Sequence, residues 1–375
     1  MWGARRRGVK VLVCPDSFTG TLTAAQAAGA MARGWSQVAE GDELVLRPMS
    51  DGGPGFLDAV QAGQGGVRHR STVTGPLGEP VAAEYLVTLD GTAWIESAQA
   101  AGLHLVAQER RDPTRTTSRG VGELLLGALA GGATHLRVGV GGTGTCDGGA
   151  GLLEAMGARA RPEGALSRGG AALAELDSVD LAPALEAVGG ATLDVATDVD
   201  VPLLGPRGAA HGFAAQKGAS PQDIEVLEAA MATWASHLGR TSAGRSAALT
   251  LGAGAGGGLG AALIRLGATR VPGIDTVLAA AGMADQVADA GLVVTGEGSF
   301  DWQSLRGKVV AGVAALALQR AVPVLVLAGR VEVSRREWIT AGVAAAFPCA
   351  PEPGEEAADA VVRAAARAAR TWARR

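Results

Sequence analysis

Glu297, Asp301 and Lys308 stand close together among glycines in the segment TGEGSFDWQSLRGK, residues 295–308. The chain has only three lysines among 33 Lys and Arg residues, yet one of them directly follows Gly307 here. An ammonium at the start of a helix, beside free backbone N–H groups, makes a favourable pocket for a phosphate. We therefore expect Lys308 to bind a phosphate or a carboxylate. Lys217, in AAQKGAS, has the same kind of setting.

Five loops share a format of small residues with one or two carboxylates, each after a predicted strand. Glycines in such loops let backbone N–H groups approach an anion, and carboxylates suit Mg²⁺, which commonly shares its oxygen ligands with phosphates. The loops therefore predict a phosphate-handling site with Mg²⁺. The residues concerned are Asp16 and Ser17 in PDSFTG, Asp51, Gly52 and Gly53 in SDGGPG, Asp147 in GGTGTCDGG, Asp198 and Asp200 in ATDVDVP, and Glu297 and Asp301.

Strands and helices alternate at both ends of the chain. Residues 9–14, 43–49 and 291–296 read as strands, and each is followed by a glycine-containing loop and a helical pattern. This order is typical of an α/β fold with a parallel sheet and crossover helices, in which ligands gather at the carboxyl ends of the strands. The candidate loops lie at such ends.

The middle of the chain has a different pattern. Several extended segments between residues 73 and 105 indicate mixed or antiparallel strands, and a helix with Ser220 at its N-cap and Pro221 at its first position follows later. We predict a mixed α/β domain of residues 74–284 inserted into a parallel-sheet domain. That domain is made from residues 1–73 and 285–375.

Composition excludes several classes of protein. The net charge of −4 gives no reason to expect nucleic acid or an acidic membrane surface as a partner. The three cysteines form no CxxC pair, and no apolar run is long enough to span a membrane. The arginine-rich N-terminus is followed by too short an apolar run for a signal peptide. We expect a cytoplasmic protein.

Two glycine-rich segments leave an alternative open. GVGGTG (139–144) and GAGAGG (252–257) fit the G-x-G-x-x-G pattern of dinucleotide folds, which would suggest an NAD-dependent oxidoreductase. Neither segment is followed by a second strand that ends in an acid about 20 residues onward, as that pattern requires. A P-loop of the usual form is absent from the sequence.

Six motifs in order resemble the type I glycerate kinase family, from about residue 9 to 348. They are PDSFTGTLTAAQAA, PMSDGGPGFLDAV, GGTGTCDGGAGLLEAMGA, ATDVDVPLLGPRGAA with FAAQKGAS, GAGAGGGLGAAL, and VVTGEGSFDWQSLRGK. The resemblance implies ATP- and Mg²⁺-dependent phosphorylation of D-glycerate, commonly to 2-phosphoglycerate. It also implies a flavodoxin/Rossmann-like domain and an inserted mixed α/β domain.

The resemblance also suggests roles for individual residues. Mg²⁺ would be held by Glu297, Asp301 and Asp147, and the hydroxyl of glycerate would be oriented or deprotonated by Asp198, with Lys217 as a second catalytic residue. Arg207 is an alternative to Lys217 for binding the carboxylate of glycerate. The remaining expected phosphate- or substrate-binding residues are Asp16, Ser17, Asp51, Gly52, Gly53 and Lys308.

The chain departs from the family pattern at four positions: Thr19, Pro54, Cys146 and Ser299. The usual residues there are lysine, glutamate, asparagine and, commonly, a basic residue. The first two differences motivate a second alternative, a non-catalytic protein that binds glycerate or a phosphosugar. The sequence leaves open which hydroxyl is phosphorylated and what the oligomer is, with a homodimer as one alternative.

Overall fold

The structure, a computed structural model, describes residues 8–18 and 20–373, so the arginine-rich start of the chain and Thr19 lie outside the described residues. No helix in these described ranges combines the length and the apolarity needed to cross a membrane. The chain forms two compact units. The first runs up to Asp51 and adds Asp58–Gln64 and the described residues from Gly273 onward, and the second comprises Gly52–Leu57 and Gly65–Pro272.

The first unit has a five-stranded sheet in the order β13-β12-β11-β1-β2, with every neighbouring pair parallel. Numbered along this unit alone, the order is that of flavodoxin-like sheets. The predicted α/β class with a flavodoxin-like domain is confirmed. The strands are β1 (Lys10–Val13), β2 (Glu43–Leu46), β11 (Leu292–Phe300), β12 (Val324–Val331) and β13 (Val343–Pro348).

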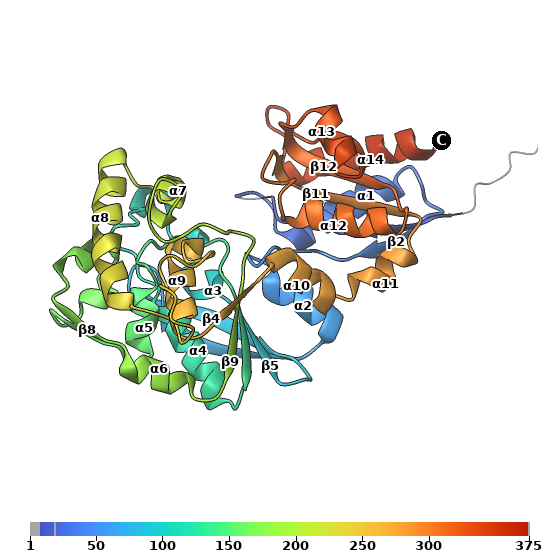
Figure 1. The fold of residues 1–375 in the computed structure, drawn as a ribbon. Helices are drawn as coiled ribbons and strands as arrows, with labels where there is room; N and C mark the ends of the chain where they lie inside the picture. The colour runs from blue at the N-terminus through green and yellow to red at the C-terminus, as the bar shows by residue number, and fades with distance from the viewer. Residues whose placement is uncertain (1–7, 19, 374–375) are drawn as a thin grey trace, which may run out of the picture. The chain divides into compact units, whose positions relative to one another are not determined.

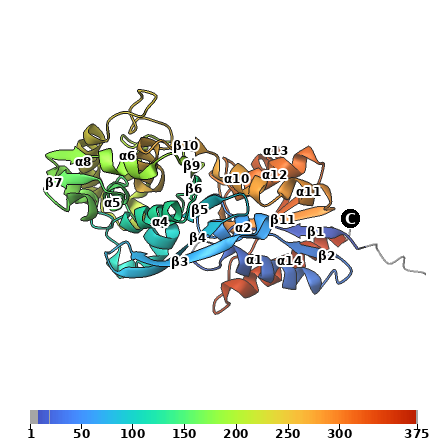
Figure 2. The ribbon, with the colours of Figure 1, turned by 90° about the horizontal axis from the view of Figure 1, so that it is seen from below.

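Helices cover both faces of this sheet. Figure 2 shows α1 and α14 on one face and α12 on the other. A Cβ atom on Gly34 of α1 would lie 2.1 Å from the carbonyl oxygen of Val362 in α14, so only glycine lets these two helices pack this closely. The helices of the unit are α1 (Ala24–Ser36), most of α2 (Phe56–Gln64), α10 (Gly273–Ala280), α11 (Met283–Ala288), α12 (Val309–Gln319), α13 (Arg335–Thr340) and α14 (Ala357–Ala373).

The second unit is built on a six-stranded mixed sheet in the order β10-β9-β6-β5-β4-β3. Its β3, β4 and β5 pair antiparallel, whereas β5, β6, β9 and β10 pair parallel, as the mixed pattern of this region predicts. The strands are β3 (Val67–Thr74), β4 (Pro80–Val87), β5 (Thr92–Glu96), β6 (His135–Gly139), β9 (Thr192–Ala196) and β10 (Thr269–Val271). A separate antiparallel pair consists of β7 (Arg159–Arg161) and β8 (Ser178–Asp180).

Helices of the second unit enclose a large apolar core against this sheet. Figure 1 shows α7 and α8 side by side, and α8 begins with the predicted cap, in which the Ser220 hydroxyl accepts from Asp223 N at 3.2 Å. The α-helices are α3 (Ala98–Ala101), α4 (Arg119–Ala130), α5 (Ala150–Ala155), α6 (Ala182–Val188), α7 (Ala209–Phe213), α8 (Pro221–Leu238) and α9 (Leu259–Arg265). Short 3₁₀ turns are η1 (Leu103–Leu105), η2 (Gln108–Arg110), η3 (Ala165–Ser167), η4 (Gly170–Glu175), η5 (Ala215–Lys217) and η6 (Ala255–Gly257).

The limits of the inserted unit differ from the predicted range of 74–284. The insertion starts nearer residue 65 because β3 is an edge strand that pairs with β4 along its whole length. Most side chains of β3 are exposed, so its sequence lacks the alternation that would mark it as a strand. The insertion ends at Pro272, because α10 packs with α11 and α12 of the first unit.

Candidate active site

The carboxyl ends of β1 and β11 lie side by side where the chain order of the parallel sheet reverses. Their pairing continues beyond β1, because Cys14 N donates to Val294 O and Asp16 N donates to Gly296 O, both at 2.8 Å. Asp16 therefore lies next to the residue that precedes Glu297. In doubly wound sheets this reversal point is where ligands bind. The structure thus brings two of the predicted site residues together.

Asp51 belongs to the same cluster. Met49 N donates to Pro15 O at 2.9 Å, which extends the pairing of β2 with β1 to within two residues of Asp51. The charge of Asp51 raises the pKa of both Asp16 and Glu297. Three carboxyl groups from the ends of three adjacent strands therefore interact.

The pKa of Asp16 is raised well above its ordinary value. Burial is the main cause, and the charges of Asp51 and Glu297 add to it. The Ser17 N–H, which donates to Asp16 Oδ1 at 2.6 Å, and the Lys308 ammonium act in the opposite direction. Asp16 is therefore a carboxyl group whose ionised form needs a nearby positive charge.

Glu297 is the most deeply buried acid of the cluster, with 7% of its surface exposed. Burial raises its pKa to about 7, opposed by the nearby Ser304 side chain and by the charge of Lys308, while Asp301 and Asp51 raise it further. Its Oε1 is buried and has no hydrogen-bond partner, and the same is true of the Ser299 hydroxyl two residues later on β11. Residues i and i+2 of a strand point to the same face, so both unpaired groups line one side of β11.

Lys308 stands at the N-cap of α12, where its carbonyl accepts the first helical hydrogen bond from Gly312 N at 2.9 Å. Gly307 precedes it with φ of +82°, a left-handed conformation that glycine adopts without strain. The first N–H groups of an 11-residue helix and one ammonium therefore lie at the same end of α12. Its charge lowers the pKa of both Asp16 and Glu297, which places it within their electrostatic reach.

Asp301 shapes the loop between β11 and α12. Its Oδ1 accepts from Gln303 N at 2.7 Å and from Ser304 N at 3.3 Å. The Ser304 hydroxyl in turn donates to Ser299 O at 3.2 Å. Sequence reasoning did not find Ser304, although an Asp followed three residues later by Ser is typical of a side-chain-capped turn.

Four carboxyl groups thus interact in the first unit, and two of them, Asp16 and Glu297, also interact with the Lys308 ammonium. Within the described residues, no group of three or more His, Cys, Asp or Glu side chains is arranged to hold a metal ion by itself. Mg²⁺ is commonly bound by one or two carboxylates, with water and phosphate oxygens as its other ligands. The buried, unpaired Oε1 of Glu297 fits that mode of binding.

Asp147, which was predicted to bind metal, has another role in the structure. Its side chain is fully buried, and Oδ2 accepts from both N and Oγ of Ser118 at 2.7 Å and from Gly151 N at 3.3 Å. Its Oδ1 accepts from Gly149 N at 3.1 Å. These bonds join the loop after β6 to the starts of α4 and α5. These contacts occupy both carboxylate oxygens and favour a structural role for Asp147 over the predicted metal-binding role.

Lys217 is also buried, with 3% of its surface exposed. Its Nζ donates to Thr145 O at 2.7 Å and to Thr143 Oγ1 at 3.2 Å, and burial lowers its pKa. A Cβ atom on Gly257 would lie 2.9 Å from Nζ, so the glycine-rich loop before α9 closes over the ammonium. In the structure the Lys217 ammonium is therefore internal, where it is hydrogen-bonded to the loop after β6 and lies against the loop before α9.

Gly52 and Gly53 pack against the sheet of the second unit. A Cβ on Gly52 would lie 2.9 Å from Ala196 O, and Gly141 N donates to Gly52 O at 3.1 Å. A Cβ on Gly141 would lie 2.7 Å from the Cα of Gly53. Backbone packing at the carboxyl ends of β6 and β9 therefore explains the need for glycine at residues 52 and 141, and Gly53 is the backbone neighbour of Gly141.

Asp198 and Arg207 remain at the surface of the second unit. Asp198 is half-buried and follows β9 at its carboxyl end, and Arg207 is exposed in the turn before α7. Both side chains are placed where a ligand could reach them. Ser17, in the first unit, is half-buried beside Asp16.

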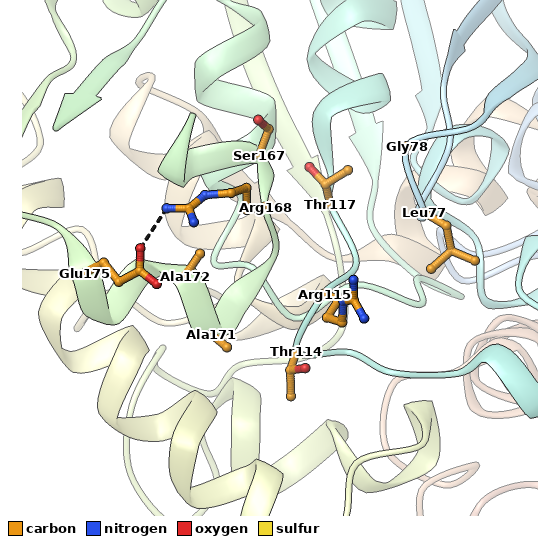
Figure 3. Close-up of a pocket in the computed structure, with 10 residues that line it drawn as sticks. All are labelled: Leu77, Gly78, Thr114, Arg115, Thr117, Ser167, Arg168, Ala171, Ala172 and Glu175. Atoms are coloured by element: carbon orange, nitrogen blue, oxygen red, sulfur yellow. Dashed lines mark hydrogen bonds and ion pairs between the residues drawn. The ribbon is translucent and has the colours of Figure 1, made fainter. Parts of the chain in front are cut away.

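The second unit also contains an open cavity of about 500 Å³. Figure 3 shows Arg168 directed toward Glu175, with which it pairs at 2.7 Å, so that its charge is already neutralised by a neighbour. No residue predicted for the site lines this cavity. Its lining consists of Leu77, Gly78, Thr114, Arg115, Thr117, Ser167, Arg168, Ala171, Ala172 and Glu175.

Comparison with known proteins places the chain in a family. A sequence model described as the glycerate kinase family matches residues 11–374. A glycerate kinase of Bacillus subtilis (strain 168) is 41% identical over 92% of this chain and 91% of its own length. A glycerate 2-kinase of Escherichia coli (strain K12) is 40% identical over 86% of this chain and 85% of its own length.

A solved structure agrees with this result. The crystal structure of a protein assigned as glycerate kinase 2 from Salmonella typhimurium LT2 has a TM-score of 0.74 and 35% sequence identity. The similarity covers 98% of this chain and 99% of that one. The chain therefore belongs to the glycerate kinase family and is an enzyme of that family.

Proposed function

We propose that this enzyme transfers the terminal phosphoryl group of ATP to D-glycerate in an Mg²⁺-dependent reaction, and that the product is 2-phosphoglycerate. The observation that carries the proposal is the cluster of Asp16, Asp51 and Glu297 beside Lys308 at the reversal point of the parallel sheet. Family membership supports the substrate, and the name of the relative from Escherichia coli supports the 2-phospho product.

The acidic cluster is the proposed Mg²⁺ site. Burial makes the ionised forms of Asp16 and Glu297 unfavourable, so an incoming cation stabilises them. We assign Glu297 as the principal ligand because its Oε1 is buried and unpaired, and Asp301 as the second, because its contacts to the loop use one oxygen. Glu297 and Asp301 would hold Mg²⁺, which would supply positive charge to neutralise the phosphate oxygens during transfer.

Lys308 and the N-terminus of α12 are the proposed phosphate site. Phosphoryl transfer depends mainly on positioning and on neutralisation of charge, because the protein forms no covalent bond to the phosphoryl group in a direct transfer. The ammonium and the free N–H groups at the start of α12 provide both. Lys308 would bind the terminal phosphate and stay with it as the bond to the leaving ADP breaks.

Asp198 and Arg207 are the glycerate-facing residues in this proposal. Asp198 would accept the proton of the C2 hydroxyl as the oxygen attacks the terminal phosphorus, and Arg207 would bind the carboxylate of glycerate. Asp198 follows a strand at the carboxyl end of the parallel part of its sheet, where ligands usually bind. Lys217 supports this unit from inside and is not assigned to the substrate.

Product analysis tests the proposal. Incubation with ATP, Mg²⁺ and D-glycerate should give ADP and a new phosphomonoester, detected by ³¹P NMR. A phosphate on C2 couples to one proton and gives a doublet, whereas a phosphate on C3 couples to two and gives a triplet. We expect the doublet. A triplet would contradict the proposed position, and the absence of any phosphomonoester would contradict the proposed reaction.

A further inference from the structure

We propose that Trp302, supported by Arg306, is the platform on which the purine base of the nucleotide stacks. This inference rests on the proposed function, since it names the residue that binds the base end of the phosphate donor. It starts from an exposed aromatic side chain that the mechanism does not use.

Trp302 is unusual in its exposure. It is 59% exposed, whereas Trp35, Trp94 and Trp234 are essentially buried. No other aromatic side chain in the described ranges is among the exposed large hydrophobic residues. A single exposed apolar residue is common on protein surfaces, and it is the surroundings of Trp302 that distinguish it.

The loop that carries Trp302 is held by hydrogen bonds on both sides of it. Asp301 N donates to Ser304 Oγ at 3.0 Å, Gln303 N donates to Asp301 Oδ1 at 2.7 Å, and Arg306 N donates to Gln303 O at 2.9 Å. The backbone at Trp302 is therefore fixed while its ring stays in solvent. A side chain on a fixed backbone loses less conformational freedom on binding a flat ligand than one on a mobile loop does.

Arg306 adds a charge to this ring. Its guanidinium carbon lies 5.3 Å from the centroid of the Trp302 ring, within the range of a cation–π contact. With most of the ring still exposed, a base can stack on the indole while the guanidinium attracts the phosphates of the same ligand. Together the two side chains match a ligand that is flat at one end and anionic at the other.

The position of the platform matches the proposed phosphate site. Trp302 lies between Glu297 and Lys308 in the chain, five residues after the one and six before the other. Six residues limit the separation of two Cα atoms to about 20 Å, within reach of an extended nucleoside triphosphate. A nucleotide whose terminal phosphates bind Lys308 can therefore place its base on Trp302.

The test measures nucleotide binding directly, so it does not depend on turnover. For Trp302→Ala we expect the Kd of Mg-ADP to rise about ten-fold, with binding of inorganic tripolyphosphate unchanged, because tripolyphosphate has no base to stack. Trp302→Phe should restore most of the affinity. Leu318→Ala is the matched control, since Leu318 is an equally exposed apolar residue at the far end of α12.

A second readout concerns the choice of base. Purines offer a larger stacking surface than pyrimidines, so the native enzyme should bind ADP and GDP more tightly than CDP and UDP, and Trp302→Ala should lose that preference. Equal loss of Mg-ADP and tripolyphosphate binding would instead make Trp302 a support for the phosphate site and overturn the inference. Unchanged Mg-ADP binding in Trp302→Ala would also overturn it. Neither result would affect the test of the reaction by product analysis.

Discussion

Replacing Lys308 by alanine is expected to lower kcat/KM for ATP by about 10²- to 10³-fold. This is the usual effect of removing one preorganised group that stabilises the charge of a transition state. Lys308 is the ammonium of the acidic cluster and stands at the N-cap of α12. Lys308→Arg is not expected to have full activity, because guanidinium and ammonium groups bind phosphate with different geometry. Steady-state kinetics with D-glycerate held at saturation would measure the effect.

Lys10→Ala is the matched control for this substitution. Lys10 lies in the same unit and forms only a surface pair with Asp289 at 3.8 Å, so its removal should leave kcat/KM unchanged. Loss of Lys308 should also raise the pKa of Glu297 further, since the ammonium lowers that pKa. The pH at which activity reaches half its maximum should therefore move upward in Lys308→Ala. Unchanged turnover and ATP affinity in this variant would remove Lys308 from the site.

Glu297→Gln is expected to have opposite effects on activity and stability. Activity with Mg-ATP should fall about 10²-fold or more, because an amide cannot supply the anionic ligand. The free energy of unfolding of Glu297→Gln should exceed that of the native protein at alkaline pH. The pKa of Glu297 is about 7 in the folded protein and 4.5 in an exposed chain, so between these values the folded state binds more protons than the unfolded state.

The sign of the stability effect follows from that difference. The contribution of Glu297 to the free energy of unfolding is most favourable below the pKa of the unfolded chain. It is lost as the pH rises through about 7, where the buried carboxylate lowers the free energy of unfolding by about 3 kcal/mol. In urea unfolding without Mg²⁺, Glu297→Gln should have a higher free energy of unfolding than the native protein at pH 8. The difference should be much smaller at pH 5. Adding Mg²⁺ and ADP should stabilise only the native protein appreciably.

Glu332→Gln serves as the control for the glutamate experiment. Glu332 is exposed and pairs with Arg330 at 3.4 Å at the end of the same sheet, so its substitution should change neither activity nor the dependence of stability on pH. Full activity in Glu297→Gln would contradict its assignment as a ligand. An unfolding free energy that is identical in the two variants at pH 8 would contradict the account of its buried charge.

Local sequence signals predict much of the fold. The apolar runs that became β1 and β2, and the Ser220–Pro221 start of α8, depend on neighbouring residues alone. The convergence of Asp16, Asp51 and Glu297 also follows from sequence, because parallel strands place their carboxyl ends at one edge of a sheet. The structure extends β11 to Phe300, beyond the predicted end at residue 296, since Glu297, Ser299 and Phe300 also pair with β12.

The internal contacts of Asp147 and Lys217 could not be predicted in this way. Each stands among glycines as a ligand-binding residue would, but the partners that bury them come from distant parts of the chain. Ser118, which donates to Asp147, is 29 residues away, and Thr145, which accepts from Lys217, is 72 residues away. Local spacing does not distinguish a carboxylate that binds a metal from one that organises a loop, because glycine and hydrogen-bonding groups surround both.

The most direct test of the account is the position of a metal ion in a crystal of the enzyme with Mn²⁺ and a non-hydrolysable ATP analogue. Mn²⁺ replaces Mg²⁺ at oxygen-ligand sites and is located by its anomalous scattering. We expect the anomalous peak within coordination distance of the Glu297 carboxylate, with the terminal phosphate of the analogue in contact with Lys308. A peak beside Asp147, or a nucleotide bound away from Lys308, would contradict the account.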